Sequence, residues 1–219
     1  MILSPSGLTP LTKKNIPSAV QVLTDAFIDY PLPGGFIKNT KRRRVVLNEF
    51  FRIVLKKAVK EKNAFHLEAV PHEIAVWLIK NKKTSVFYDI RYVSFSTLKL
   101  LFSIRLKELR SLMGCVKRID ALIERQKFSP AAVELLLLAV APDYQHQGRA
   151  STLLRSTFET FDRDQTDCFL TTNKASNTGI YEKLGFKLVY HTVDAPTNLD
   201  VFIMFRPANI YNMNIGEPL

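Results

Sequence analysis

The sequence is poor in cysteine, which argues against a disulfide framework or a zinc site. Its two cysteines, Cys115 and Cys168, lie far apart in 219 residues and stand in no C-x-x-C or histidine-rich context. This spacing does not fit zinc-ligand patterns, so we expect no bound metal. A reducing, cytoplasmic compartment is the simplest interpretation.

Long apolar runs are also missing. The longest, Leu135–Ala141, is far shorter than a bilayer span, and Met1–Thr12 has no basic segment followed by an apolar one. We therefore expect a soluble protein with no membrane partner. The 47% hydrophobic content suffices for a continuous core. Without repeats, low-complexity tracts or a linker, residues 1–219 are predicted to form a single domain.

Acidic residues are scarce: 20 Asp and Glu stand against 31 Lys and Arg, giving a net charge of +11. Such a balance favours anionic partners, whether nucleic acid, acidic membrane or a phosphorylated cofactor. One basic cluster spans Lys41–Arg44. The second comprises Arg105, Lys107, Arg110, Lys117 and Arg118. We interpret both clusters as solvated helix faces. Because neither is interleaved with aromatics in a recognised motif, no nucleic-acid partner is expected.

Apolar spacing in the first third predicts two helices. The first shows helical spacing of apolar residues over Ile16–Phe27, with Pro17 suited to its first turn, and is predicted to end near Tyr30–Pro31, where the run Leu32–Gly35 breaks it. The second, basic helix covers about 41–60. Its predicted buried stripe consists of Val45, Phe50, Phe51, Val54, Leu55 and Ala58.

The remaining pattern predicts an α/β fold with a mixed sheet. Segments 64–70 and 73–79 resemble a β-hairpin, and residues 93–130 contain a helical insertion. Strands and helices then alternate. The predicted order is strand 133–140, helix 148–161, strand 168–172, helix 177–184, and strands 187–193 and 200–205.

The segment Val133–Leu154 holds the clearest chemical signal, because a buried strand leads through a turn into an amphipathic helix. Gly148 and Ala150 fall where the turn becomes helix. A helix N-terminus presents unpaired N–H groups, so a loop with small residues there can bind a diphosphate. Neither G-x-x-x-x-G-K-(S/T) nor G-x-G-x-x-G occurs here, which indicates a different nucleotide-like ligand. Close packing of helix on strand explains the small residues equally well.

Two motifs resemble the GNAT acetyltransferase superfamily. Gln145–Ala150, QHQGRA, matches the (Q/R)-x-x-G-x-(G/A) acetyl-CoA signature, and Val140–Pro142 matches the strand exit before it. Asn177–Phe186 resembles the second block, an Asn followed by a helix with Tyr and a closing Gly-Phe. The front segment Asp25–Pro31, together with the insertion, resembles the puromycin-acetyltransferase-like branch.

This resemblance implies a fold and an activity. The fold is a mixed, mostly antiparallel sheet of about six to seven strands flanked by helices. The activity is acetyl-CoA-dependent N-acetylation of a primary amine, on a small molecule or a peptide, by direct attack in a ternary complex. A homodimer is implied as an option. A domain that binds acyl-CoA without turnover is the alternative, and a basic nucleic-acid-binding protein is a weaker one.

The resemblance also assigns the cofactor contacts. The backbone of Leu138, Ala139 and Val140 pairs with the pantetheine arm beside a bulge, and the N–H of Val140 faces the thioester carbonyl. Amides along the following loop hold the diphosphate. That loop comprises Gln145, His146, Gln147, Gly148, Arg149, Ala150 and Ser151. Arg149 and Arg155 add positive charge for the phosphates, although Arg149 would equally suit a solvent-facing position.

Glu134 and Tyr181 are the implied catalytic residues. Glu134 precedes the signature by the spacing of the general-base glutamate in GNAT histone acetyltransferases, and an ordinary carboxylate at a strand end is the alternative. Tyr181 matches the tyrosine near the cofactor sulfur and can protonate a thiolate, or it is simply an aromatic of the core. Asn177 contacts the cofactor arm or caps its helix, and Asn173 is a weaker contact candidate. The predicted acceptor-site residues are Phe27, Tyr30 and Phe36.

Overall fold

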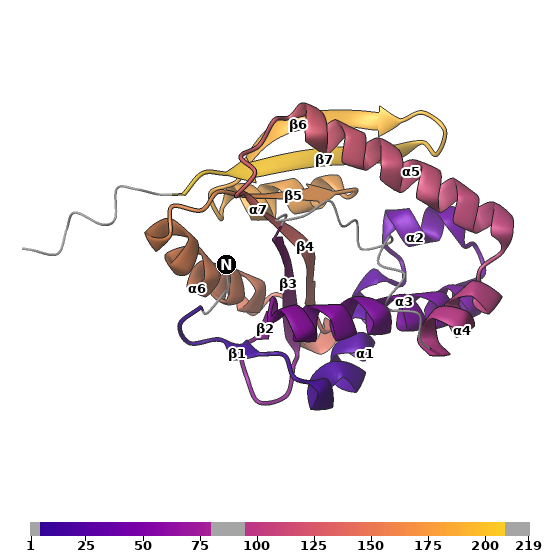
Figure 1. Ribbon diagram of the computed structural model, residues 1–219, viewed down its shortest axis with the longest axis horizontal. Helices are drawn as coiled ribbons and strands as arrows, with labels where there is room; N and C mark the ends of the chain where they lie inside the picture. Colours follow the sequence, from indigo (N-terminus) through magenta and orange to yellow (C-terminus); the bar gives the residue numbers. More distant parts are fainter. Residues whose placement is uncertain (1–4, 80–94, 209–219) are drawn as a thin grey trace, which may run out of the picture.

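A seven-stranded mixed sheet forms the centre of the computed structural model, which describes residues 5–79 and 95–208 (Figure 1). Its strands are β1 (Thr9–Pro10), β2 (Ala64–His66), β3 (Glu73–Ile79), β4 (Val133–Val140), β5 (Cys168–Thr172), β6 (Lys187–Asp194) and β7 (Leu199–Arg206). They follow the order β1-β2-β3-β4-β5-β7-β6, in which β4 and β5 are parallel and the other described pairs are antiparallel. The predicted mixed sheet is confirmed.

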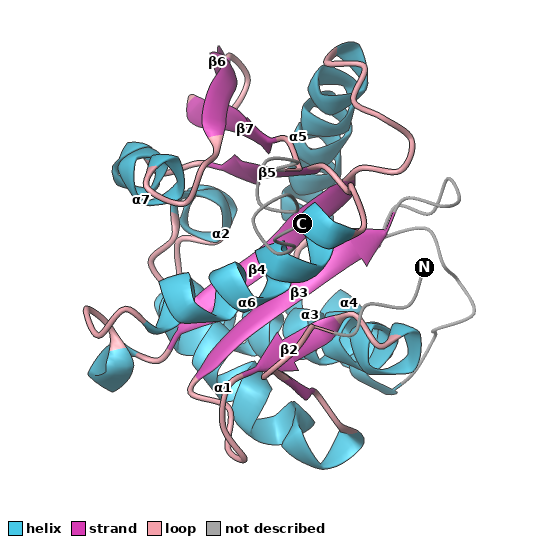
Figure 2. Ribbon diagram, turned by 90° about the vertical axis from the view of Figure 1, so that its left-hand side faces the viewer, coloured by secondary structure: helices cyan, strands magenta, loops and turns pink. Residues whose placement is uncertain are grey.

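Helices cover both faces of the sheet (Figure 2). They are α1 (Ile16–Phe27), α2 (Pro31–Phe36), α3 (Thr40–Glu61), α4 (Phe95–Ser103), α5 (Leu106–Arg125), α6 (Arg149–Arg163) and α7 (Thr178–Glu182). On one face, Leu153, Phe158 and Phe161 of α6 pack against a core that includes Trp77. On the other face, α1 and α3 cover β3 and β4.

Helix α5 covers the β5–β7 half of that second face, where Cys115 and Ile119 pack against Val201 and Ile203. The helical prediction for 93–130 is met by two helices, α4 and α5, although residues 93 and 94 lie outside the described part. Both cysteines are buried free thiols.

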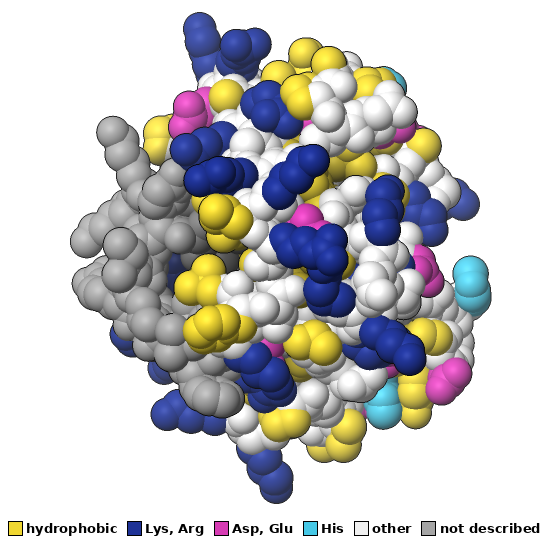
Figure 3. All heavy atoms as spheres, turned by 90° about the vertical axis from the view of Figure 1, so that its right-hand side faces the viewer, with side chains coloured by type: hydrophobic (Ala, Val, Ile, Leu, Met, Phe, Trp, Pro, Cys, Tyr) yellow, Lys and Arg dark blue, Asp and Glu magenta, His cyan; other side chains and the backbone are white. Residues whose placement is uncertain are grey.

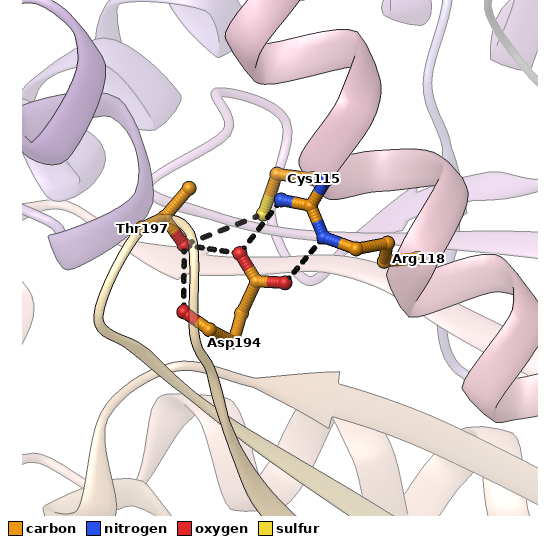
Figure 4. Close-up of polar contacts among 4 residues, drawn as sticks. All are labelled: Cys115, Arg118, Asp194 and Thr197. Atoms are coloured by element: carbon orange, nitrogen blue, oxygen red, sulfur yellow. Dashed lines mark hydrogen bonds and ion pairs between the residues drawn. The ribbon is translucent and has the colours of Figure 1, made fainter.

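A polar cluster fixes α5 to the turn between β6 and β7 (Figure 4). Arg118 donates from Nε and Nη2 to the two carboxylate oxygens of Asp194, at 2.5 and 2.8 Å. Thr197 Oγ1 donates to the same carboxylate at 2.5 Å, and the Sγ of Cys115 lies 4.0 Å from that hydroxyl. The hydrogen bonds from Arg118 lower the pKa of Asp194 to about 2.

Several expectations for the front half need correction. Helix α1 ends at Phe27, before the predicted end near Tyr30–Pro31. Residues 32–35 are themselves helical, because Pro31 begins α2 after an extended Tyr30, at a position where a missing N–H costs nothing. Val45 is 39% exposed and does not belong to the buried stripe of α3, whereas Val46 and Leu47 do. The first hairpin strand ends at His66 instead of residue 70, since the next N–H, of Leu67, donates to the Glu73 carboxylate at 2.9 Å.

The first basic cluster is only partly a solvated helix face, because Lys41 and Arg44 are exposed whereas Arg42 is half-buried and Arg43 is buried. Arg42 pairs with Glu108, and Arg44 pairs with Asp25 at 2.6 Å. Arg43, 8% exposed, donates to the Ile37 carbonyl at 3.1 Å and forms an ion pair with Asp29. These arginines therefore tie α3 to its neighbours.

The side of the molecule that carries α3, α4 and α5 is nevertheless rich in Lys and Arg side chains (Figure 3). Exposed basic residues of α5 include Lys107, Arg110 and Lys117. Within the described ranges, no helix has both the length and the apolar character needed to cross a membrane. The same ranges contain no group of three or more His, Cys, Asp or Glu side chains placed to hold a metal.

Candidate active site

A cleft opens where β4 and β5 separate. The two strands pair at Val133–Leu135 against Cys168–Leu170, and beyond these residues they diverge. Figure 2 shows the two strands running at an angle to each other. The cleft has a volume of about 600 Å³, and its walls come from the end of α1, β4, the start of α6, the end of β5 and α7. This volume is within the range of small-molecule sites.

A bulge at Leu136 makes the second half of β4 available to a ligand. In the register with β3, Trp77 lies opposite Leu135 and Val76 opposite Leu137, so Leu136 is the extra residue. Leu136 and Leu137 both pack on the α1 side, whereas Leu138 packs on the α6 side. Two successive side chains on one face are expected at a bulge, where the ladder shifts by one residue.

The bulge also reverses which residues direct their amides toward β5. Before it, the Val133 N–H donates toward β5, to the Asp167 carbonyl at 2.9 Å. After it, the Ala141 N–H donates to the β3 side, to the His72 carbonyl at 2.7 Å. Because hydrogen-bonding direction alternates along a strand, Leu138 and Val140 direct their N–H groups into the cleft. The Val140 carbonyl is on this side too and accepts from Gln145 Nε2 at 3.1 Å.

The N-terminus of α6 lies beside this open strand edge. Gly148 is its N-cap in the left-handed region, at φ 75°, and a side chain there would be strained although nothing lies within 4 Å of it. The first N–H bonded within the helix is that of Thr152, which donates to the Gly148 carbonyl at 3.0 Å, so the amides of Arg149, Ala150 and Ser151 have no partner within the helix. Together with Gln145 and His146, these residues line the cleft. Free amides at a helix N-terminus suit an anionic group, and the diphosphate contacts assigned to these residues stay a prediction.

Arg149 does not turn to solvent, and its guanidinium is already paired. Its Nε donates to Glu73 at 2.5 Å, and Nη2 lies 2.9 Å from Glu68 in an ion pair. The hydrogen bond that Arg149 donates to Glu73 is the main cause that raises the pKa of Arg149. Arg155 lies further along α6, exposed, beside a second hollow that it shares with Lys183 and Arg206. Gln147, on the loop before α6, is exposed and donates from Nε2 to the Asp143 carbonyl at 3.2 Å.

Tyr181 reaches the cleft from α7. Its ring is partly buried against the core and lies edge-on to Phe186, with centroids 5.7 Å apart. Burial, followed by the nearby Tyr30, raises the pKa of Tyr181 above its usual value. The phenol therefore stays protonated at neutral pH, and the residue both packs in the core and presents a proton donor.

Tyr30 and Phe27 line the opposite wall, with ring centroids 5.0 Å apart, and their role as acceptor-site residues stays a prediction. The Tyr30 hydroxyl lies 2.7 Å from Thr172 Oγ1 and accepts the Asn173 N–H at 3.0 Å. Phe36 does not join them, because it packs with α5 residues in other parts of the core.

Asn177 and Asn173 have different surroundings. Asn177 lines the cleft and donates from Nδ2 to Thr172 Oγ1 at 3.2 Å, and in the described structure its side chain makes no capping bond to α7. Asn173 instead donates from Nδ2 to the Asp200 carbonyl on β7 at 2.6 Å. Among described residues, Asn173 is not part of the cleft lining.

Glu134 lies before the bulge, is 8% exposed, and stands between Leu78 of β3 and Phe169 of β5 in the sheet. The described lining of the cleft does not include it. Its catalytic assignment stays a prediction. The sequence reasoning missed two residues that line or support the site: Thr172, which connects Tyr30 to Asn177, and Glu73, which pairs with Arg149. No local pattern marks either one.

The fold and this cleft together define a GNAT acetyltransferase fold. A family model described as acetyltransferase (GNAT) domain matches residues 110–188, from within α5 to the start of β6. No curated protein matches the chain. The match covers less than half of the chain, and the family that it describes uses acetyl-CoA.

Solved structures confirm the fold over nearly the whole chain. A histone acetyltransferase HPA2 and related acetyltransferase from Corynebacterium glutamicum is 15% identical with a TM-score of 0.60, covering 94% of this chain and 98% of that one. Arylalkylamine N-acetyltransferase 2 from Aedes aegypti is 14% identical with a TM-score of 0.60, covering 92% and 98%. The PaiA N-acetyltransferase from Thermoplasma acidophilum, in complex with coenzyme A, is 13% identical with a TM-score of 0.54, covering 91% and 97%.

Proposed function

We propose that this protein is an acetyl-CoA-dependent N-acetyltransferase that acts on a primary amine. The observation that carries this proposal is the juxtaposition, in one cleft, of the open edge of β4 and the N-terminus of α6. An acyl-CoA has a peptide-like arm suited to a strand edge and a diphosphate suited to a helix N-terminus. The open edge of β4 and the N-terminus of α6 thus suit the two halves of one ligand.

The donor set of the cleft fits acetyl-CoA. The N–H groups of Leu138 and Val140 are directed away from β3, and those of Arg149, Ala150 and Ser151 begin α6. The coenzyme supplies an acetyl thioester, which an amine converts to an amide with release of the thiol. In this proposal the Val140 N–H donates to the acyl oxygen as negative charge develops on it.

Tyr181 is the proposed acid. Its O–H gives a proton to the departing sulfur, and the proton lost by the amine nitrogen restores the balance through solvent. A phenol kept neutral by burial is suited to this role. Glu134 is the proposed base, and its place outside the cleft lining means that it would act through water.

Binding is tested first, by calorimetry of the folded protein with acetyl-CoA and CoA. Saturable binding at one site is expected, and its absence would refute the proposal. Thiol release over a panel of small amines and amino-terminal peptides then tests turnover. Binding without thiol release from any amine would favour a non-catalytic acyl-CoA sensor.

The catalytic assignments are tested by single substitutions. Tyr181→Phe should lower kcat roughly 100-fold while leaving CoA affinity within about twofold, because only the proton donor is removed. Tyr190→Phe, the same change at an exposed position on β6, is the matched control. If Glu134 is the base, Glu134→Gln should lower kcat at neutral pH, with a smaller loss as rising pH deprotonates the amine. A pH-independent effect would assign Glu134 a structural role.

The acceptor class also belongs to this proposal. Phe27 and Tyr30 give the far wall an aromatic character with one hydroxyl. This lining favours an amine with an apolar or aromatic body. We also propose the puromycin-acetyltransferase-like branch, on the motif around Asp25–Pro31.

A further inference from the structure

Glu73 is a fully buried carboxylate at the start of β3, with no exposed surface. A buried charge is costly unless both of its oxygens are bonded. Here Oε1 accepts the Leu67 N–H at 2.9 Å, and Oε2 accepts Arg149 Nε at 2.5 Å. One side chain therefore joins the connection after β2 to the first residue of α6.

The same residue borders the open end of β4. Glu73 lies directly opposite Val140 in the antiparallel register, and its neighbour His72 accepts the Ala141 N–H at 2.7 Å. Val140 is the residue whose N–H is directed into the cleft. Glu73 thus contacts both structural parts of the proposed cofactor site, the strand edge and the helix N-terminus.

Arg149 is held on more than one side. Besides Glu73 it has Glu68 at 2.9 Å, and its guanidinium carbon lies 5.3 Å from the ring centroid of Tyr144. Tyr144 in turn stacks on His72, with centroids 3.9 Å apart and planes at 13°. Two carboxylates face the single positive charge of this arginine and more than neutralise it, and its side chain is 15% exposed.

We propose that Glu73 is a positioning residue of the coenzyme A site, which acts through Arg149 to fix the first turn of α6 against the open end of β4. Anion affinity then comes from main-chain N–H groups, and Arg149 serves as a structural link and not as a phosphate ligand. This inference rests on the proposed function.

The experiment measures CoA affinity by calorimetry for Glu73→Gln, Arg149→Gln and the double variant. Each single change should weaken CoA binding about tenfold, the effect of losing one charge-assisted hydrogen bond. Because both changes break the same contact, the double variant should lose no more than the larger single loss. The double variant replaces both charged groups by amides and so leaves no unpaired buried charge. It can therefore be measured even if a single variant fails to fold.

Asp194→Asn is the matched control for general destabilisation. It too converts a buried, arginine-bonded carboxylate to an amide, but at the α5 anchor, remote from the cleft. It should lower Tm while leaving the Kd for CoA unchanged. If Glu73→Gln and Asp194→Asn weakened CoA binding to the same extent for the same loss of Tm, the positioning role would be overturned.

Salt dependence separates a link from a phosphate ligand. Affinities are compared at about 50 and about 300 mM NaCl, because salt screens exposed charge pairs. The double variant should show the salt dependence of the wild type. A reduced dependence would place Arg149 on the phosphates and overturn the inference, as would an unchanged Kd in folded Glu73→Gln. No CoA binding by the wild type would instead refute the proposed function, and this inference with it.

Discussion

At the scale of single residues, the Tyr30 hydroxyl is the main polar connection between α1 and the end of β5. It accepts the Asn173 N–H and forms a hydrogen bond with the Thr172 hydroxyl. Thr172 Oγ1 also accepts a hydrogen bond from Asn177. Thr172 is 2% exposed, so water cannot easily replace these bonds. The Tyr30 hydroxyl therefore fixes its own wall of the cleft to the wall formed by the end of β5.

Tyr30→Phe should therefore destabilise the fold, because it leaves the Asn173 N–H and the Thr172 hydroxyl without this partner. The expected loss is about 1–2 kcal/mol, or roughly 2–8 °C in Tm. Thermal unfolding followed by circular dichroism checks the prediction. Tyr190→Phe, on the exposed face of β6, should leave Tm unchanged. Equal melting of the two variants would show that the Tyr30 hydroxyl contributes nothing to stability.

At the scale of elements, the carboxylate of Asp194 anchors α5 over β5–β7. Its hydrogen bonds from Arg118 and Thr197 lower its pKa to about 2, below the value of about 3.9 for an unfolded Asp. A lowered carboxyl pKa stabilises the fold above the unfolded value, and the effect is lost as pH falls from about 4 to about 2. Arg118 is 42% exposed, so solvent screening reduces the gain to about 1 kcal/mol.

This pH dependence is measurable. Between pH 5 and 2, the wild type should lose about 1 kcal/mol more stability than Asp194→Asn, whose amide does not titrate in this range. Urea unfolding at a series of pH values gives both curves. Parallel curves would show that the anchor contributes no pH-dependent stability.

The sequence predicted those elements whose pattern is local. The bounds of β4 and β5 match the predicted ranges, because each is a continuous apolar segment bounded by turn residues. Helix α1 starts where predicted, but it ends at Phe27, before the predicted end near Tyr30–Pro31. It missed β1, whose two residues are too short to show a period. Helix α2 was also missed, because four of its six residues are Pro or Gly, which have the lowest helix propensities.

The candidate site divides in the same way. The loop before α6 and Tyr181 were predicted, because they follow from a contiguous motif. Contacts between distant segments could not be: Tyr30 and Thr172 are 142 residues apart, and Glu73 and Arg149 are 76 apart. Arg149 was expected at phosphates or in solvent, and its two acidic partners lie in a segment that looked like an ordinary hairpin.

At the scale of the whole molecule, the cleft lies between the two halves of the sheet, β1–β4 and β5–β7. A ligand that contacts β4, α6 and α7 should therefore stabilise both halves together. At 100 times its Kd, CoA should add about 2.7 kcal/mol and raise Tm by roughly 5–10 °C.

Hydrogen exchange locates this effect. With CoA bound, the amides of Val140 and of Arg149, Ala150 and Ser151 should exchange more slowly, while those of the outer edge of β6 should not change. Protection spread evenly over the chain, or limited to β6, would contradict the proposed site.

The bulge at Leu136 has a consequence for how such proteins diverge. Because it turns backbone amides toward the cleft, the side chains of the same residues only have to pack in the core. A substitution of similar volume there would leave the direction of the amides unchanged. The arrangement of the backbone can therefore be kept while the sequence changes, and this chain has the same fold as a structure of 15% identity, with a TM-score of 0.60.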